Sequence, residues 1–198
     1  MFVTFEGLDG SGKSTQARLL VEALEHEARD VVLTREPGGT ELGERIRELL
    51  LNGPDPSPWA EATLFAAARA ELVDRVIAPA LERGADVVCD RYLDSSLAYQ
   101  GIARGLGVGE VLELNLRAIR GTLPDRTFLL LLSPEEAAHR VGDETDRIER
   151  EDGDFRARVA EAYRELAETF PQRIEPVDAT RPAAEIARLI FDQIRPSL

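Results

Sequence analysis

Apolar positions along the chain follow two alternating spacings. Short continuous apolar runs predict strands that are buried on both faces, as the strands of parallel sheets are. These runs cover residues 2–5, 31–34, 87–89, 128–132 and 174–177. Between them, apolar residues recur every three or four positions, which predicts helices that bury one face. The helical segments are 13–27, 42–51, 61–83, 95–103, 108–121, 151–170 and 183–194.

The alternation of strands and helices predicts the fold class. It indicates an α/β fold in which a five-stranded parallel sheet is flanked by helices on both faces. The 198 residues contain no internal repeat and no low-complexity linker, so we expect a single domain over 1–198. Pro79 should kink the helix predicted over 61–83. The charge-dense segment 142–154 is either a mobile surface element or an ordinary solvated face.

Composition excludes several classes of protein. The net charge of −13 argues against binding to nucleic acid, whose partners present a basic face. The longest apolar run, 128–132, is far shorter than the roughly 18 residues of a membrane helix. The single cysteine excludes an internal disulfide and a multi-cysteine zinc site. Because the first residues show no signal-peptide pattern either, we expect a cytoplasmic protein without a membrane or nucleic-acid partner.

The basic residues are unusually distributed between arginine and lysine. Of the 24 basic residues, Lys13 is the only lysine. A GC-rich coding bias or a salt-adapted acidic surface explains the shortage, and the second explanation gives the hypothesis of a halophilic, high-salt cytoplasm. Equal stability in dilute buffer and in molar KCl would count against that hypothesis. With either explanation, this one lysine was retained.

The retained lysine lies in a phosphate-binding motif. Residues 7–14 match G-x-x-x-x-G-K-[ST] between a predicted strand and a predicted helix. Its glycines let consecutive N–H groups point at an anion, and the helix dipole adds to their attraction. Lys13 is expected to reach the β- and γ-phosphates of a nucleoside triphosphate, and Ser14 to ligate Mg²⁺. The residues expected to bind ATP here are Gly7, Leu8, Asp9, Gly10, Ser11, Gly12, Lys13, Ser14 and Thr15.

A phosphate loop alone does not distinguish a GTPase from a motor or a small-molecule kinase. The guanine-recognition motif N-K-x-D is absent, because no lysine follows residue 13. Asp90 and Arg91 follow the strand predicted over 87–89, at the sheet edge where α/β folds bind ligands. Asp90 can hold Mg²⁺ or its waters, and Arg91 can bridge phosphates. Taken alone, this dipeptide would more often be a surface ion pair that follows a core strand.

Longer stretches resemble one family. Residues 90–100, DRYLDSSLAYQ, resemble the signature of thymidylate kinases at every position. TREPGGT at 34–40 and LFAAAR at 64–69 are similar to the corresponding segments of bacterial-type members. DRIE at 146–149 resembles the family's lid, and DAT at 178–180 its last strand. The resemblance covers nearly the whole chain and implies the P-loop fold of nucleoside monophosphate kinases, with a short lid at about 140–153.

The resemblance implies that the chain transfers the γ-phosphoryl group of ATP to dTMP, with Mg²⁺ as cofactor and a homodimer as the assembly. Phe65 would stack on thymine and Arg69 would donate to its O4. Arg35 and Arg91 would bind the acceptor phosphate, and Asp9 would contact the 3′-hydroxyl. Other positions implied at the two nucleotides are Ser96, Tyr99 and Gln100 for dTMP and Arg140, Asp178, Ala179 and Thr180 for ATP.

The resemblance also raises the question of which arginine stabilises the transferring phosphoryl group. Eukaryotic members carry an arginine in the phosphate loop, where this chain has Gly10. The charge must then come from the lid, where Arg140, Arg147 and Arg150 are available, and we favour Arg147 because it lies in the matched DRIE. The expected catalytic set is Lys13, Asp9, Arg91, Arg147 and Arg150. A kinase for another nucleotide or a deoxynucleoside, or a non-catalytic nucleotide-binding switch, are the alternative functions.

Overall fold

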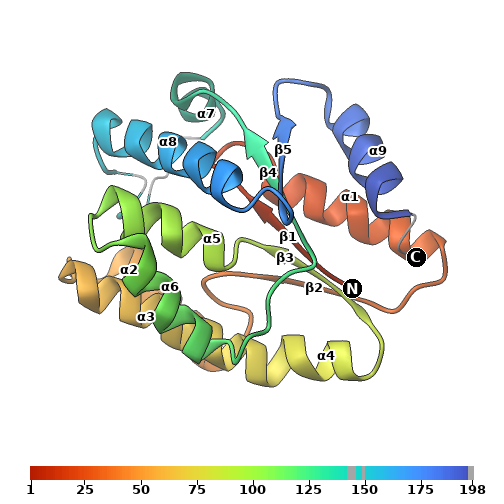
Figure 1. The fold of residues 1–198 in the computed structure, drawn as a ribbon, viewed down its shortest axis with the longest axis horizontal. Coiled ribbons are helices and arrows are strands. Elements are labelled where there is room, and N and C mark those ends of the chain that lie inside the picture. Colours follow the sequence, from red (N-terminus) through yellow and green to blue (C-terminus); the bar gives the residue numbers. More distant parts are fainter. Residues whose placement is uncertain (142–145, 149, 196–198) are drawn as a thin grey trace.

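A computed structural model describes residues 1–141, 146–148 and 150–195 of the chain. At its centre is a five-stranded sheet in the order β2-β3-β1-β4-β5 (Figure 1). Every neighbouring pair of strands is parallel, which confirms the predicted fold class. The strands are β1 (Phe2–Glu6), β2 (Val31–Arg35), β3 (Asp86–Asp90), β4 (Arg126–Leu131) and β5 (Ile174–Asp178).

Helices cover both faces of this sheet, as expected. Helices α1 and α9 pack together on one face, and α3, α6, α8 and the π-helical segment η2 lie on the other (Figure 1). None of the described helices is long and apolar enough to span a bilayer. The α-helices are α1 (Lys13–His26), α2 (Glu41–Asn52), α3 (Pro58–Leu72), α4 (Ala78–Glu82), α5 (Leu93–Ser96), α6 (Val108–Ala118), α7 (Pro134–Arg140), α8 (Gly153–Thr169) and α9 (Ala183–Ile194).

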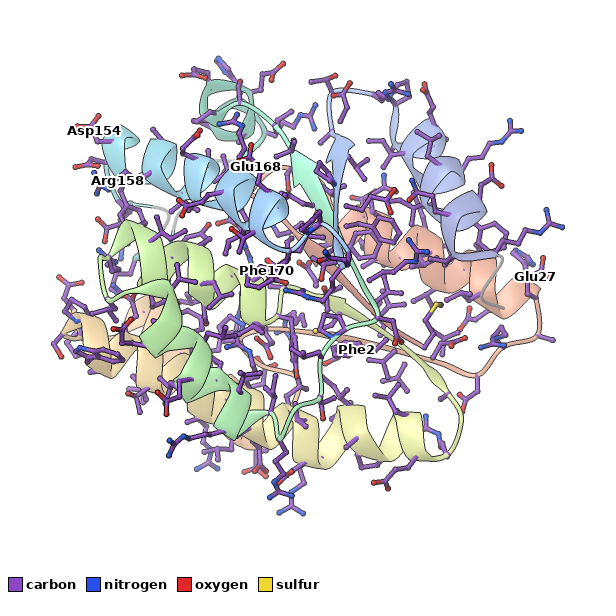
Figure 2. The ribbon with its side chains drawn as sticks, in the orientation of Figure 1. Phe2, Glu27, Asp154, Arg158, Glu168 and Phe170 are labelled. Atoms are coloured by element: carbon purple, nitrogen blue, oxygen red, sulfur yellow. The ribbon has the colours of Figure 1, made fainter. Side chains whose placement is uncertain are left out.

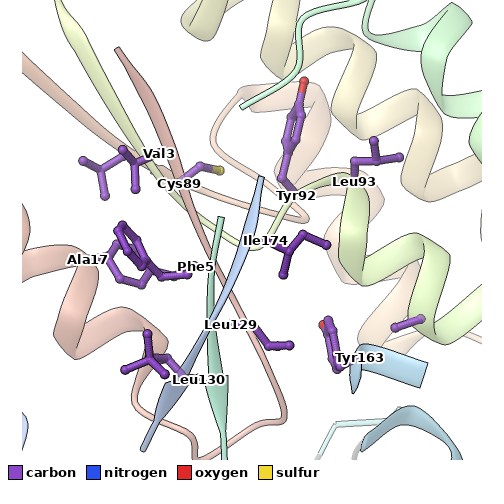
Figure 3. Close-up of a cluster of buried hydrophobic side chains, with 14 of the residues drawn as sticks. Val3, Phe5, Ala17, Cys89, Tyr92, Leu93, Leu129, Leu130, Tyr163 and Ile174 are labelled. Atoms are coloured by element: carbon purple, nitrogen blue, oxygen red, sulfur yellow. The ribbon is translucent and has the colours of Figure 1, made fainter. Parts of the chain in front are cut away.

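The core explains why the central strands are continuous apolar runs. Every residue of β1 is buried, because side chains from both faces of the strand pack against helices. Figure 3 shows Phe5 and Leu130 on the side of Ala17, whereas Leu129 and Ile174 lie on the side of Tyr163. Most charged side chains lie at the surface, as Asp154 and Arg158 on α8 do in Figure 2.

Two predicted helices differ from expectation in their winding. The helix predicted over 61–83 begins earlier, at Pro58, and changes to the π-helical segment η1 (Val73–Ile77), which ends two residues before Pro79. Proline lacks an N–H and crowds the preceding turn, and a local π-turn relieves both conflicts. The segment predicted over 95–103 consists of the end of α5 and the second π-helical segment, η2 (Leu97–Ala103). This segment follows Asp90 and Arg91 and lines the site described below. Single π-turns are frequent at functional sites.

Helix α7 was not expected from the spacing of apolar residues. It has seven residues, too few for a helical period to stand out. Its start is nevertheless marked by a capping box, in which Ser133 and Glu136 satisfy each other's backbone N–H groups. The lid expected at about 140–153 lies partly outside the described residues, which omit 142–145 and 149.

Candidate active site at the carboxyl ends of the strands

A cavity of about 570 Å³ lies at the carboxyl ends of β1, β2 and β3. Open α/β sheets bind ligands at this edge. The structure brings most of the predicted site residues to this one cavity. Those that line it are Asp9, Gly10, Gly12, Lys13, Ser14, Thr15, Arg35, Phe65, Asp90, Arg91, Ser96, Tyr99, Gln100 and Arg140.

The phosphate loop, residues 7–14, leads from β1 into α1 along one wall of the cavity. Gly7, Gly10 and Gly12 all have positive φ, the left-handed region that glycine adopts without strain. A Cβ at Gly7 would lie 2.5 Å from the carbonyl oxygen of Leu130, so the loop also packs too closely on β4 for a side chain. No side chain caps the first turn of α1. Its N–H groups are therefore available to an anion in the cavity.

Lys13 is almost enclosed by the phosphate loop, with 6% of its side chain exposed. Its Nζ donates to the carbonyl oxygen of Leu8 at 2.8 Å and lies 3.5 Å from Asp9 Oδ1. Burial and the nearby positive charge of Arg91 lower the pKa of Lys13, whereas Asp9 and Asp90 oppose that shift. A polyphosphate beside Nζ would favour the charged ammonium further.

Arg91 lies at the centre of a polar network. Its guanidinium pairs with Asp9 and donates to Ser95 Oγ at 3.0 Å and to the Tyr163 hydroxyl at 3.1 Å. Burial opposes ionisation of Asp9, but the charges of Arg91 and Lys13 outweigh it and hold the pKa of Asp9 well below its usual value. Arg91 has a φ of 68°, a strained conformation for a side-chain-bearing residue. These contacts hold the strained residue in place.

Behind Arg91 lies a carboxyl group that the sequence analysis did not assign to the site. Glu6, at the end of β1, is fully buried and accepts from Ser95 Oγ at 2.6 Å and from the Tyr163 hydroxyl at 3.0 Å. Burial and the negative charge of Asp94 raise the pKa of Glu6 to about 7. The available signal was a charged residue ending an otherwise uncharged, largely apolar strand. Tyr163, on α8, carried no comparable signal.

The oxygen atoms expected to hold Mg²⁺ come together at the mouth of the phosphate loop. Ser14 Oγ donates a hydrogen bond to Asp90 Oδ2, and both residues line the cavity. No group of three or more metal-binding His, Cys, Asp or Glu side chains occurs among the residues that the structure describes. Mg²⁺ in phosphate-transfer sites uses one or two protein oxygens, together with substrate phosphates and waters. A hydroxyl and a carboxylate beside a phosphate loop fit that requirement.

On the opposite wall, Phe65 and Arg69 stand one helical turn apart on α3. Phe65 is half-buried and lines the cavity. Arg69 is fully buried and does not line it, so direct contact with a base is not what this structure shows. Its Nη2 lies 2.5 Å from Glu36 Oε2, and its Nη1 donates to Ser96 Oγ at 3.0 Å. Arg69 therefore anchors Glu36 and Ser96, which do line the cavity.

Two arginines of the TREPGGT segment and α2 add positive charge to the cavity. Arg35 forms a bidentate ion pair with Glu44, with N–O distances of 3.0 and 3.1 Å. Arg47 donates to the carbonyl oxygen of Pro37 at 2.9 Å, and the sequence analysis did not identify it. Burial and the positive charge of Arg35 lower the pKa of Arg47. An anion here would relieve that repulsion.

The structure does not place Arg147 where a transferring phosphoryl group could be stabilised. Its guanidinium is buried against α2 and α3, donating to the carbonyl oxygen of Leu50 at 2.8 Å and to Glu61 Oε2 at 2.6 Å. The motif DRIE identifies the residue but not the direction of its side chain. Arg150 is exposed and also lies outside the lining of the cavity.

Arg140, by contrast, lies at the cavity from the end of α7. Its Nη1 donates to the carbonyl oxygen of Ala179 at 3.2 Å, which ties it to the segment 178–180 that follows β5. In that segment, Asp178 Oδ1 accepts from the Thr180 backbone N–H at 3.0 Å. Asp178, Ala179 and Thr180 do not line the cavity themselves but flank it through Arg140.

Comparisons with known proteins agree with this geometry. The family model for thymidylate kinase matches residues 5–190. The chain is 49% identical to a thymidylate kinase of Symbiobacterium thermophilum, over 95% of this chain and 89% of the relative. It is 52% identical to one from Clavibacter michiganensis, over 96% and 92%. The crystal structure of thymidylate kinase from Ehrlichia chaffeensis superposes with a TM-score of 0.79 at 33% identity, covering 98% of each chain.

Proposed function

The chain belongs to the thymidylate kinase family, and on that premise we propose how its site carries out the reaction. The reaction transfers the γ-phosphoryl group of ATP to dTMP and gives dTDP and ADP. The observation that carries the assignment of roles is a single cavity with the phosphate loop on one wall and Phe65 on the other. A donor and an acceptor nucleotide can therefore meet within one cavity.

The donor triphosphate binds the phosphate loop. Backbone N–H groups of the loop and of the first turn of α1 surround its β-phosphate, and the Lys13 ammonium reaches between the β- and γ-phosphates. Arg140 lies over the loop, and the segment 178–180 borders the adenine. Ser14 and Asp90 would hold Mg²⁺, which neutralises charge on the donor phosphates when bound.

The acceptor nucleotide occupies the opposite half of the cavity. Phe65 stacks on the thymine, and Gln100 addresses its edge. Arg35 and Arg91 bind the 5′-phosphate, while Asp9 receives the 3′-hydroxyl. Tyr99 packs against the sugar, where a ribose 2′-hydroxyl would project. Because the acceptor phosphate is already an anion, positioning and charge stabilisation suffice without a general base.

The charge on the transferring group is stabilised by Lys13, Arg91 and Arg140. We assign to Arg140, rather than to Arg147, the role of stabilising the transferring phosphoryl group, because Arg140 lies at the cavity while Arg147 is bound to Glu61. An arginine at this position is typically worth about 10³- to 10⁵-fold in rate. Arg150 is the remaining candidate in the same segment.

A coupled assay of ADP release tests this function. Wild-type chain with ATP and Mg²⁺ should release ADP on addition of dTMP, and dUMP or dCMP should be poorer acceptors. Lys13→Ala should abolish turnover, because no other lysine can replace the lost ammonium. ATP binding without ADP release would favour the nucleotide-binding switch. Faster turnover of dUMP or dCMP than of dTMP would favour a kinase for another nucleotide.

Three further assignments belong to the same proposal. The chain forms a homodimer, which an exposed stripe of Trp59, Thr63 and Ala67 along α3 supports. It resides in the cytoplasm, where ATP and dTMP are available. Its net charge of −13 supports adaptation to high salt, in which counterions screen the repulsion between surface carboxylates.

A further inference from the structure

A buried carboxylate on α3 lies directly behind the residue assigned to the base edge. Glu61 is 2% exposed and does not itself line the cavity. Its Oε1 accepts a hydrogen bond from Gln100 Nε2 at 2.9 Å, and its Oε2 accepts from Arg147 Nη2 at 2.6 Å. Arg104 approaches both oxygens at 3.3 Å. Burial opposes ionisation, but these donors outweigh it and lower the pKa of Glu61, so the group is a carboxylate near neutral pH.

A carboxylate fixes the orientation of the neighbouring amide. Glu61 can only accept hydrogen bonds, so the NH₂ end of Gln100 must face it, and the carbonyl Oε1 must turn the other way. The opposite orientation would place two oxygen atoms in contact within a buried site, which is strongly unfavourable. Gln100 lines the cavity and is otherwise buried, so this amide has one defined face toward the ligand.

The defined face matches one kind of pyrimidine. Thymine and uracil present an N3–H donor beside the O4 acceptor, whereas cytosine presents the N3 acceptor beside an amino donor. An amide whose carbonyl is turned to the base accepts from N3–H, and its second N–H can donate to O4. The reversed amide would suit cytosine instead. The orientation of one amide therefore decides which pattern the site recognises.

We infer that Glu61 is a specificity-determining positioning residue, which locks Gln100 in the orientation that accepts N3–H and so excludes cytosine nucleotides. This inference rests on the proposed function and adds a residue that acts through Gln100 without touching substrate. Arg147 completes the arrangement, because it binds Oε2, while the shortest hydrogen bond to Oε1 comes from the amide. The positive charges of Arg147 and Arg104 also make the buried carboxylate stable.

Glu61→Gln is a sharp test because Arg147 dictates how the new side chain sits. Arg147 can only donate, and its bond of 2.6 Å is shorter than the 3.3 Å contacts of Arg104. It will therefore bind the carbonyl of the introduced amide and turn the NH₂ of that amide toward Gln100. Gln100 must then reverse to present its own carbonyl to that NH₂. The ratio of kcat/KM for dTMP to that for dCMP should fall at least about tenfold. One buried polar group left without its partner changes the preference for a substrate by a factor of that size. The ratio for dTMP to dUMP should stay within about threefold, because both bases carry N3–H.

Controls separate this effect from loss of structure. Glu161→Gln on α8 also removes a carboxylate from an ion pair, with Arg164 at 3.0 Å, but far from the base, and should leave both ratios unchanged. Calorimetric binding of dTMP, dUMP and dCMP to each variant gives the same comparison without turnover. Equal losses for all three acceptors in Glu61→Gln would overturn the inference. Failure of the wild-type chain to turn over dTMP would instead overturn the proposed function.

Discussion

At the scale of single residues, Glu6 links the stability of the fold to pH. Its carboxyl is buried behind Arg91, and its pKa is raised from 4.5 to about 7. Between these two values the folded chain keeps a proton that the unfolded chain has released. The contribution of Glu6 to the free energy of unfolding therefore falls as the pH rises through this range. Asp9, whose pKa is lowered, changes the free energy of unfolding only in more acidic solution.

Replacing Glu6 with Gln should remove this pH dependence. The amide keeps the shape and can still accept from Ser95, but it does not titrate. Between pH 5 and pH 7.5 the wild-type chain should lose about 2 kcal/mol more unfolding free energy than Glu6→Gln, from a shift of this size. Urea unfolding at the two pH values measures it. Other titrating groups are shared by both proteins and cancel, so identical slopes would contradict the assignment.

The residues that could be predicted from sequence are those whose neighbours along the chain define them. Lys13 and Ser14 follow from the phosphate loop, and Asp90 and Arg91 from the end of a strand, because backbone geometry alone directs them to one edge. Arg147 could not be placed in this way. Its side chain can turn toward the nucleotides or toward Glu61, and only the tertiary structure decides.

At the scale of elements, α7 determines what the phosphate loop can contain. A Cβ on Gly10 would lie 2.5 Å from the carbonyl oxygen of Ala137 and 3.2 Å from Arg140 Cβ. The loop therefore has no room for the arginine that eukaryotic relatives carry at this position. The same helix that closes this space brings Arg140 to the cavity. Short helices of this kind are hard to predict, because seven residues provide less than two full turns of periodicity.

Gly10→Ala should therefore raise the KM for ATP more than the KM for dTMP. The added methyl pushes α7 and Arg140 away from the phosphate loop, so KM for ATP should rise about tenfold or more, the order expected for losing one hydrogen bond to a charged group. KM for dTMP should change little. Gly84→Ala is the matched control, because its φ of 85° is close to the 82° of Gly10 but nothing lies within 4 Å of the added Cβ. If both variants leave KM for ATP unchanged, α7 does not position Arg140.

At the scale of the whole molecule, α3 and α6 expose several uncharged side chains. Trp59 on α3 is 47% exposed, and Thr63 and Ala67 continue its stripe at intervals of four residues. Leu116 on the neighbouring helix α6 is also exposed. Exposed large apolar side chains that gather on neighbouring helices are typical of a surface that another protein covers. The proposed homodimer would bury it.

Ala67→Arg should split that dimer. An arginine at position 67, the last residue of the stripe, would bury an unpaired charge between two copies, which interfaces do not tolerate. The mass measured by light scattering should fall from two chains to one. Leu189→Arg on α9, an exposed apolar residue on the other face of the sheet, should leave the mass unchanged. Loss of the dimer in both variants, or in neither, would place the contact elsewhere.

The lone lysine has a practical consequence for any chemist who handles this chain. Apart from the α-amine, the chain offers a single nucleophilic amine, and that amine lies against Leu8 and Asp9 in the loop that we propose binds the triphosphate. Acylating reagents can therefore modify only Lys13 and the α-amine. A nucleotide bound at the phosphate loop would protect Lys13 from such reagents. The extent of Lys13 labelling would then measure the fraction of chains with bound nucleotide, with no tag or engineered probe.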